Sequence, residues 1–201
     1  GMAQEYDVSS KIIALAGDGD DILDFSAVTD VAVSFEIEGG SGNDEILTGA
    51  GFAVVRGGAG DDEITTLDGD DLIFGDAGND TIVSGGGNDV IFGDGARIDD
   101  EGVEVKVSTG LTDGDDVINA GAGDDVIFGG GGDDTIGGDL DPTVPDPDTD
   151  PAGNDTIFAD GATLVLSAAN NFAAIATIED TDRIGGGNDV VYGHRGNDLI
   201  Y

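Results

Sequence analysis

The stretch GGAGDDEITTLDGDDLIFGDAGNDTIVSGGGNDVIF, residues 57–92, consists of four consecutive copies of one nine-residue unit. Each copy has Gly at position four, Asp at position six and Ile at position eight. A disordered Gly/Asp linker would have no reason to keep one large aliphatic residue in phase with a glycine. A short fixed period of this kind predicts a solenoid, in which each unit stacks on its neighbours.

The same unit, written G-G-x-G-x-D-x-U-x with U a large aliphatic residue, recurs along most of the chain. Further copies occupy 39–47, 111–119, 120–128, 129–137, 150–158, 184–192 and 193–201, with a weaker copy at 16–24. Position six is Asp in all twelve of these copies. Another copy, at 48–56, departs from the pattern because Ala53 stands at position six.

The composition of the unit predicts turns and short strands. Glycine accepts positive φ angles, so positions one to six favour a tight turn. Positions seven to nine suit a short strand whose position eight points inward. Two units then make one coil, and every second unit stacks about 4.8 Å from its equivalent. We therefore predict an all-β fold, a right-handed parallel β-roll with two sheets. One inner face is expected to carry Ile46, Ile64, Ile82, Ile118 and Ile136, and the other Val55, Ile73, Ile91, Ile127 and Ile157.

The charge of the chain restricts its partners. Lys and Arg number 6 against 44 Asp and Glu, which gives a formal net charge of −38. Such an imbalance destabilises a compact state unless cations neutralise it, and it argues against nucleic acid or an anionic membrane as a partner. The chain has no Cys, which excludes disulfides and thiolate zinc sites. No apolar run is long enough to predict a membrane span.

Stacking also places aspartate over aspartate along both edges of the predicted roll. Two carboxylates about 4 Å apart repel by about 4 kcal/mol at an effective dielectric constant of about 20. A hard cation between successive coils would reverse the sign of this interaction. Calcium accepts carboxylate and backbone carbonyl oxygens in flexible geometry, whereas magnesium requires a stricter octahedron. The pattern therefore favours calcium.

In this motif the chain resembles the RTX family of secreted repeats-in-toxin proteins, which have parallel β-rolls that bind calcium. The resemblance implies calcium ions between stacked turns, held by the position-six aspartates of both turns and by turn carbonyls. It implies about nine ions. The aspartates implied at one edge are Asp44, Asp62, Asp80, Asp116 and Asp134, with Asp189 and Asp21 as further candidates, and those at the other edge are Asp71, Asp89, Asp125, Asp155 and Asp198. The implied glycines are Gly40, Gly42, Gly58, Gly60, Gly69, Gly78, Gly85, Gly87, Gly114, Gly121, Gly123, Gly130, Gly132, Gly153, Gly186, Gly187 and Gly196. Ala53 weakens the case for an ion between the copies at 48–56 and 66–74.

Three inserts interrupt the array, at about 94–110, 138–149 and 159–183. The first alternates Val103, Val105 and Val107 with charged residues, which predicts a hairpin with a partner strand at Ile98. The second is rich in Pro and acidic residues and is typical of a surface loop. The third predicts another hairpin, with a short helix at 168–176 as the alternative. Asp94 and Asp160, at the bases of the two hairpins, are either extra calcium ligands or solvated turn residues.

The outward position nine differs between the two sheets. One sheet carries Phe74, Phe92, Phe128, Phe158 and Tyr201 there, and we expect an apolar hairpin or a partner to cover this stripe. Residues 1–38 lack the regular repeat and are expected to form irregular cap strands, with the array occupying 39–201. The alternation of Val31, Val33, Phe35 and Ile37 predicts a strand within that segment.

Nothing in the sequence predicts catalysis. His194 is the only histidine, lies in a glycine turn beside Arg195, and is interpreted as a solvated turn residue. Carboxylate pairs are too frequent here to carry catalytic information. The EF-hand pattern is absent. The resemblance to the RTX family implies export by type I secretion, so that the protein is secreted or lies at a bacterial cell surface. We expect this chain to be a non-enzymatic, monomeric structural segment of a larger, adhesin-like protein. The alternatives are the carrier region of an exported protease, lipase or haemolysin, or a calcium buffer.

Overall fold

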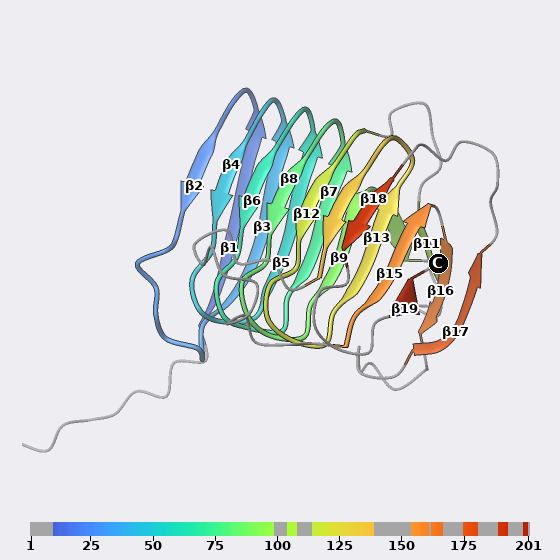
Figure 1. Ribbon diagram of the computed structural model, residues 1–201. Helices are drawn as coiled ribbons and strands as arrows, with labels where there is room; N and C mark the ends of the chain where they lie inside the picture. The colour runs from blue at the N-terminus through green and yellow to red at the C-terminus, as the bar shows by residue number, and fades with distance from the viewer. Residues whose placement is uncertain are drawn as a thin grey trace, which may run out of the picture.

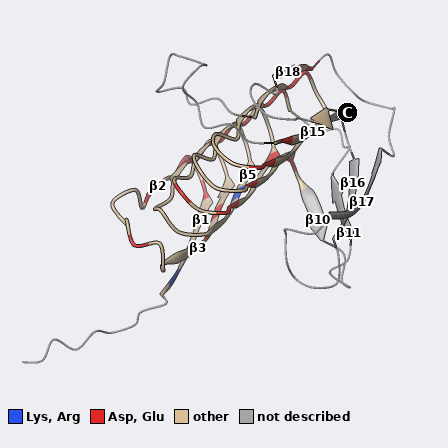
Figure 2. Cartoon of the chain, turned by 60° about the horizontal axis from the view of Figure 1, so that its bottom comes forward, with Lys and Arg blue, Asp and Glu red and all other residues tan. Residues whose placement is uncertain are grey.

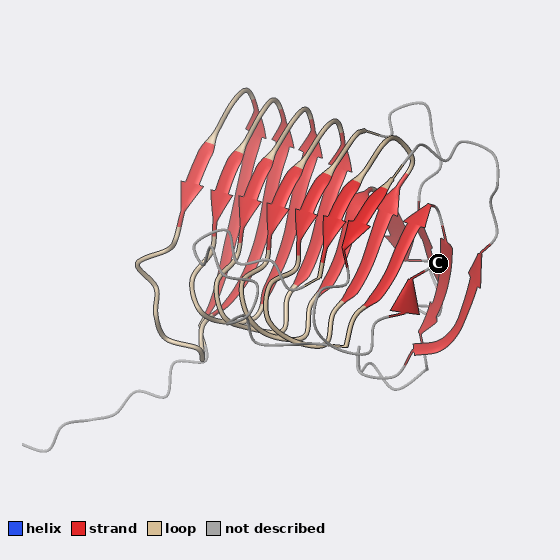
Figure 3. Cartoon of the chain, in the orientation of Figure 1, coloured by secondary structure: helices blue, strands red, loops and turns tan. Residues whose placement is uncertain are grey.

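The computed structural model describes residues 10–98, 104–107, 114–138, 154–160, 162–166, 175–180, 189–192 and 199–200. Within these ranges every regular element is a strand, and turns connect the strands (Figures 1 and 3). The chain winds as a solenoid whose strands form two parallel sheets, and a smaller third sheet lies beside one end (Figure 1). The prediction of an all-β, two-sheet parallel roll is confirmed.

Consecutive strands of the roll alternate between the two sheets. In spatial order the first sheet contains β1 (Lys11–Asp18), β3 (Ser34–Ser41), β5 (Ala53–Ala59), β7 (Leu72–Ala77), β9 (Val90–Asp94), β13 (Val126–Gly130), β15 (Thr156–Asp160) and β19 (Leu199–Ile200). The second sheet contains β2 (Ile22–Asp24), β4 (Glu45–Leu47), β6 (Glu63–Thr65), β8 (Thr81–Val83), β12 (Val117–Asn119), β14 (Thr135–Gly137) and β18 (Val190–Tyr192). Each coil therefore contributes one strand to each sheet.

Position eight forms the core between the sheets, as predicted. In the first sheet Val55 pairs in register with Ile73, and the same row continues through Ile91, Ile127 and Ile157. In the second sheet Ile46, Ile64, Ile82, Ile118 and Ile136 form the equivalent row. All ten side chains are buried. Burying one such side chain stabilises the fold by about 1.5–3 kcal/mol, so these rows supply much of the cohesion between coils.

The described part of the N-terminal segment continues the roll. β1 pairs in parallel with β3, and β2 pairs in parallel with β4, so residues 10–38 add a coil although they lack the regular nonapeptide. The strand predicted from Val31 starts only at Ser34. A turn precedes it, because the Asp30 carboxylate accepts a hydrogen bond from the Ala32 amide and the Asp30 carbonyl accepts one from Val33.

The outward phenylalanines of the first sheet form a second apolar cluster. Phe74, Phe92, Phe128 and Phe158 are all buried and stack with centroid distances of 5.1, 4.8 and 5.0 Å. The Arg56 guanidinium lies 3.9 Å from the centre of the Phe74 ring and closes one end of the ladder. The stripe is therefore not bare; Tyr201, its predicted last member, lies outside the described residues.

The first and third inserts together form the small third sheet. Its strands are β10 (Ala96–Ile98), β11 (Glu104–Val107), β16 (Ala162–Leu166) and β17 (Ile175–Asp180), all antiparallel. Both predicted hairpins are present. The pairing of β11 with β16, which joins them, was not predicted. Of the alternative helix at 168–176, residues 168–174 lie outside the described residues and the last two belong to β17. Residues 139–149 of the second insert also lie outside the described residues.

The first insert interrupts one turn of the roll, and the chain leaves and rejoins the roll within that turn. Gly93 and Asp94 continue β9, with Asp94 in register with Asp76 of the preceding coil. The turn resumes at Gly114, where a Cβ would lie 1.9 Å from the Gly78 carbonyl oxygen. Positions one to three of this turn are thus Gly93, Asp94 and Gly95, which replace residues 111–113 of the nine-residue frame. The insert leaves the stacking of the remaining turn residues unchanged.

Candidate metal centre

The position-six aspartates at the first edge of the roll form one continuous row. This edge comprises the turns that lead from the first sheet to the second. The Oδ1 atom of each aspartate accepts a hydrogen bond from the backbone N–H of the aspartate in the preceding coil. For Asp44 to Asp62, and for Asp62 to Asp80, the N–O distance is 2.8 Å. The other links of the row are Asp21 to Asp44, Asp80 to Asp116, Asp116 to Asp134 and Asp134 to Asp189, at 2.8 to 3.0 Å.

The second oxygen of these carboxylates is left without a partner. Within the described part of the chain, Oδ2 is buried and makes no hydrogen bond in Asp21, Asp44, Asp62, Asp80, Asp116 and Asp134. Apart from the partly buried Asp21, these residues are only 1 or 2% exposed. A buried carboxylate oxygen without a hydrogen bond costs several kcal/mol or more unless a proton or a cation satisfies it. The row therefore presents a regular series of buried carboxylate oxygens that a cation could bind.

The opposite edge has an equivalent row of aspartates, but hydroxyl side chains stand in the turns beside two of them. The Ala53 amide donates to Asp71, Asp71 donates to Asp89, Asp89 to Asp125 and Asp125 to Asp155, at 2.7 to 3.1 Å. Thr66 and Ser84 stand at position one of the turns that carry Asp71 and Asp89. The Thr66 hydroxyl donates its proton to the Ser84 carbonyl, and the Ser84 hydroxyl donates its proton to the Ala120 carbonyl. The Oδ2 atoms of Asp71 and Asp89 therefore remain without a hydrogen bond.

Burial makes these carboxylates difficult to ionise in the absence of a cation. It raises the pKa of Asp80 and Asp116 to about 8, and those of Asp134 and Asp71 to about 7. The backbone hydrogen bond that each Oδ1 accepts lowers the pKa, but desolvation outweighs it. A divalent cation at these oxygens would restore the ionised form. The electrostatics of both rows thus match a cation site.

Position one at the first edge must be glycine for a steric reason. A Cβ on Gly57 would lie 2.3 Å from Asp62 Oδ2 and 2.7 Å from the Gly75 carbonyl oxygen. Gly39 and Gly75 have the same relation to Asp44 and Asp80. These glycines allow the backbone to pack directly against the Oδ2 atom of the aspartate. The carboxylate is therefore enclosed by backbone and shielded from water.

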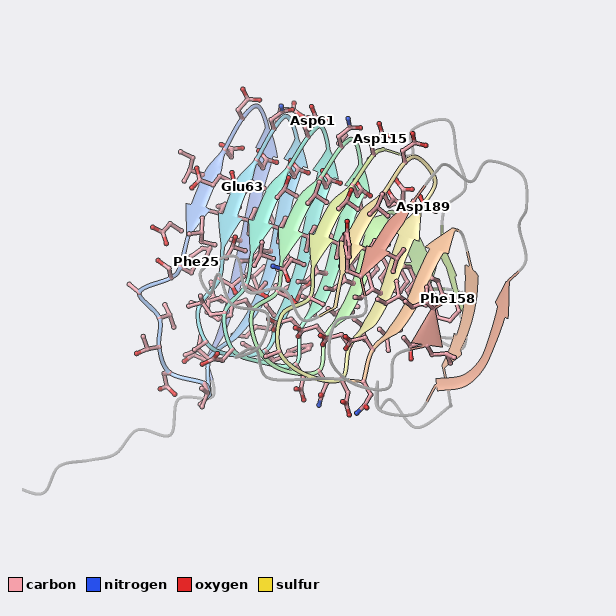
Figure 4. The ribbon with its side chains drawn as sticks, viewed as in Figure 1. Phe25, Asp61, Glu63, Asp115, Phe158 and Asp189 are labelled. Carbon is pink, nitrogen blue, oxygen red and sulfur yellow. The ribbon has the colours of Figure 1, made fainter. Side chains whose placement is uncertain are left out.

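Position five forms a second ladder of carboxylates and amides on the outside of the turns. The side-chain oxygen of each residue accepts a hydrogen bond from the backbone N–H of the position-five residue in the next coil. At the first edge the ladder consists of Asp20, Asn43, Asp61, Asn79, Asp115 and Asp133, and at the second edge of Asp70, Asn88, Asp124 and Asn154. Asp and Asn alternate over most of its length, which spaces the charges. Figure 4 shows Asp61 and Asp115 of this ladder at the outer turns.

Asp94 is a buried carboxylate, not a solvated turn residue. Its Oδ1 accepts from the Gly114 amide at 3.2 Å and its Oδ2 from the Gly131 amide at 2.6 Å. It thereby joins the two halves of the interrupted turn to the next coil. No pattern in the sequence distinguishes this role, because acidic residues occur throughout the Gly/Asp-rich array. The side chain of Asp160 lies outside the described residues.

Two carboxylates meet at each step of a row, which limits the metals that fit. Among the described residues no group of three or more His, Cys, Asp or Glu side chains gathers as a metal site. Backbone carbonyls must therefore complete any coordination shell. Glycine carbonyls lie in these turns, packed so closely that a Cβ at Gly40, Gly58 or Gly60 would lie 2.0 to 2.3 Å from the glycine carbonyl oxygen of the preceding coil. An all-oxygen set of carboxylates and carbonyls fits calcium.

Most of the predicted site residues lie in these two rows. The predicted aspartates from Asp21 to Asp189 stack as expected, and acidic residues mark the turns along the roll (Figure 2). Asp198, His194, Gly153, Gly186, Gly187 and Gly196 lie outside the described residues. The Thr66 and Ser84 hydroxyls and the position-five ladder were missed. The alternation of Asp and Asn at position five was the available signal for the ladder.

The chain matches the family model for the RTX calcium-binding nonapeptide repeat. The matches cover residues 36–55, 48–82, 65–96, 112–142 and 185–201, more than half of the chain. The chain belongs to the RTX calcium-binding repeat family. No curated protein and no solved structure matches it. Among the described residues of this RTX roll no helix is long and apolar enough to cross a membrane.

Proposed function

We propose that this RTX roll is a structural segment that becomes compact only when calcium occupies both rows of turns. The observation that supports the proposal best is the repeated buried Oδ2 without a hydrogen bond, at Asp44, Asp62, Asp80, Asp116 and Asp134. A formal charge of −38 adds a general repulsion that bound divalent ions would reduce. The pairs of stacked aspartates favour an occupancy of about nine ions.

The segment would serve a secreted or cell-surface protein exported by type I secretion, in an adhesin-like role. An acidic chain that stays unfolded where calcium is scarce would pass through a secretion channel and fold outside, because metal binding and folding are coupled when the site exists only in the folded state. The hairpins joined in the third sheet favour this role over that of a simple secretion array. We further propose that the segment itself is not an enzyme.

A titration of folding with calcium tests the proposal. The purified chain is expected to show little β signal by circular dichroism in EGTA and to gain it steeply as calcium is added, while magnesium at the same concentration has a much smaller effect. Isothermal titration calorimetry or a calcium electrode then counts the ions. A full β signal in EGTA would contradict the proposal, and independent shallow binding sites would favour a calcium buffer.

The alternative function is the carrier region of an exported enzyme or toxin. The RTX repeats themselves favour it as much as they favour the structural role, since both use the same roll. Fusing the chain to an inert reporter distinguishes the two: a carrier region is expected to direct export of the reporter from a cell with a type I secretion apparatus. A structural segment would fold in calcium without directing export.

A further inference from the structure

Three turns at the second edge of the roll carry a hydroxyl residue at position one, where the first edge has glycines such as Gly57. The three residues are Thr48, Thr66 and Ser84, and each is at most 1% exposed. The backbone amide of each donates to the position-nine carbonyl of the next coil, so these residues continue the ladder of the second sheet into the turn. A row of buried hydroxyls therefore runs beside the aspartates of this edge.

A side chain at position one meets the position-six carboxylate of its own turn. At the first edge a Cβ on Gly57 would lie 2.3 Å from Asp62 Oδ2. At the second edge a Cβ on Gly138 would lie 2.0 Å from Asp155 Oδ2. The two positions are thus neighbours in both rows, and the residue at position one decides what the carboxylate faces.

Thr66 and Ser84 place a hydroxyl at this point. The Thr66 side chain lies close enough to the Asp71 carboxylate to interact with it, and Ser84 has the same relation to Asp89. Both aspartates are buried, with exposures of 2 and 1%. Each of these turns therefore holds one hydroxyl and one carboxylate together, away from water.

The oxygens that meet in these two turns are all acceptors. The Thr66 hydroxyl donates its proton to the Ser84 carbonyl at 2.8 Å, and the Ser84 hydroxyl donates to the Ala120 carbonyl. The Oδ2 atoms of Asp71 and Asp89 are buried and have no hydrogen bond. A hydroxyl that has given up its proton keeps only lone pairs for other neighbours. Buried acceptors that face one another in this way need a cation between them.

The hydroxyls stand at the end of the second row where carboxylates are fewest. The row begins at Asp71, because Ala53 occupies position six of the preceding coil and contributes only its amide. Asp71 consequently has a stacked carboxylate on one side only, which is that of Asp89. Calcium takes six to eight oxygens, charged or neutral. A hydroxyl oxygen here would replace part of the ligand set that Ala53 removes.

We propose that the hydroxyl oxygens of Thr66 and Ser84 are calcium ligands, together with the carboxylates of Asp71 and Asp89. This proposal rests on the calcium-dependent folding proposed for the roll, because the four side chains meet only in the folded chain. It makes the two edges chemically different. At the first edge, carboxylates and backbone oxygens form the sites, whereas the second edge adds side-chain hydroxyls.

A valine substitution tests whether the hydroxyl binds the ion or only packs. Thr66→Val keeps the shape of the side chain and removes its oxygen. Thr48→Val is the matched control, since Thr48 is equally buried but Ala53 leaves its turn without a carboxylate. Urea denaturation at a series of calcium concentrations gives the free energy of unfolding. Its slope against the logarithm of the calcium concentration counts the ions taken up on folding.

At calcium concentrations that just saturate the unsubstituted chain, Thr66→Val is expected to take up fewer ions, by up to one per chain. Thr48→Val and the hydroxyl-retaining Thr66→Ser are expected to match the unsubstituted chain. A hydroxyl that only donates its hydrogen bond would lower the free energy of unfolding without changing the slope. Equal slopes in all four proteins would therefore overturn the proposal. A slope of zero in the unsubstituted chain would instead refute calcium-dependent folding itself.

Anomalous scattering from a calcium-bound crystal of the unsubstituted chain gives a second test that needs no variant to fold. An ion is expected within about 2.3–2.6 Å of Thr66 Oγ1, and another at the same distance from Ser84 Oγ. Ions that contact Asp71 and Asp89 but neither hydroxyl would overturn the proposal and leave the calcium-dependent folding intact.

Discussion

Gly57 and Gly86 are both turn glycines, but only Gly57 is sterically required. A Cβ on Gly57 would lie 2.3 Å from Asp62 Oδ2, whereas the nearest atom to a Cβ on Gly86 would be 3.4 Å away. Gly57→Ala is therefore expected to destabilise the calcium-bound roll by about 1–3 kcal/mol or more, as overpacking does. Gly86→Ala is the control and should change the free energy of unfolding little. Urea denaturation in calcium measures both, and equal effects would contradict the assignment.

Asp80 belongs to two steps of the first row, because its amide donates to Asp116 and its Oδ1 accepts from Asp62. Asp80→Asn keeps the side-chain shape but removes the charge from both neighbouring ion sites. The calcium concentration at half folding is expected to rise at least about tenfold, equivalent to about 1.4 kcal/mol. Asp61→Asn is the control, since Asn already alternates with Asp in the exposed ladder at position five. A similar shift in both variants would show that general charge, not the buried row, sets the calcium requirement.

The raised pKa values of the buried row set a pH dependence. The pKa of Asp80 and Asp116 is raised to about 8 and that of Asp62 to about 6, above the ordinary 3.8, chiefly by burial. Between about pH 4 and pH 8 the metal-free folded state therefore binds more protons than the unfolded chain, and its stability falls as pH rises. Calcium must displace these protons, so its affinity rises over the same window. Calcium titrations monitored by circular dichroism at several pH values check both slopes; an affinity independent of pH would contradict the burial of these groups.

At the scale of elements, the phenylalanine ladder ties four strands of the first sheet together. Phe92 stacks between Phe74 and Phe128, at 5.1 and 4.8 Å, and all three are buried. Phe92→Ala is expected to cost about 3–5 kcal/mol of unfolding free energy in calcium. Thr65→Ala, at the same repeat position in the second sheet, is the control and is only partly buried. Comparable losses in the two variants would mean that the ladder adds nothing beyond ordinary packing.

The strands within the repeat could be predicted because their period determines both turn and core. Within one nine-residue unit Gly60 lies in the turn, Asp62 in the aspartate row and Ile64 in the core, and the same positions of the unit have the same places in successive coils. Residues 1–38 were expected to form cap strands because they lack the regular repeat. In the structure the stacking partners of this coil are 23 residues apart, as in Asp20 and Asn43, while those of regular coils, such as Asn43 and Asp61, are 18 apart. A search for a nine-residue period cannot detect that spacing.

At the scale of the whole molecule, the contacts that the sequence did not predict are those between inserts. β11 pairs with β16, two strands that grow from different coils and share no periodic pattern. The pairing depends on the stacking of the coils, which brings the hairpin bases to the same edge. Asp94 is buried for a related reason, since the Gly114 and Gly131 amides reach it only after the insert has returned to the roll. Such features follow from the assembled solenoid and not from any local stretch.

The position of the first insert leads to a prediction for the whole roll. Gly95 stands at the third position of its turn and Gly114 at the fourth, so deleting residues 96–113 joins them into an uninterrupted unit, GDGGDDVIN. The shortened chain is expected to fold in calcium with β9 leading directly into the turn of Asp116, and to bind as many ions as the full chain. The third sheet would lose β10 and β11, which lowers stability without removing the roll.

Deleting 96–112 instead leaves one extra residue in the turn, and this control is expected to need more calcium to fold. Circular dichroism and calcium counting compare the variants; failure of the in-phase deletion alone to fold would show that the insert is part of the turn itself.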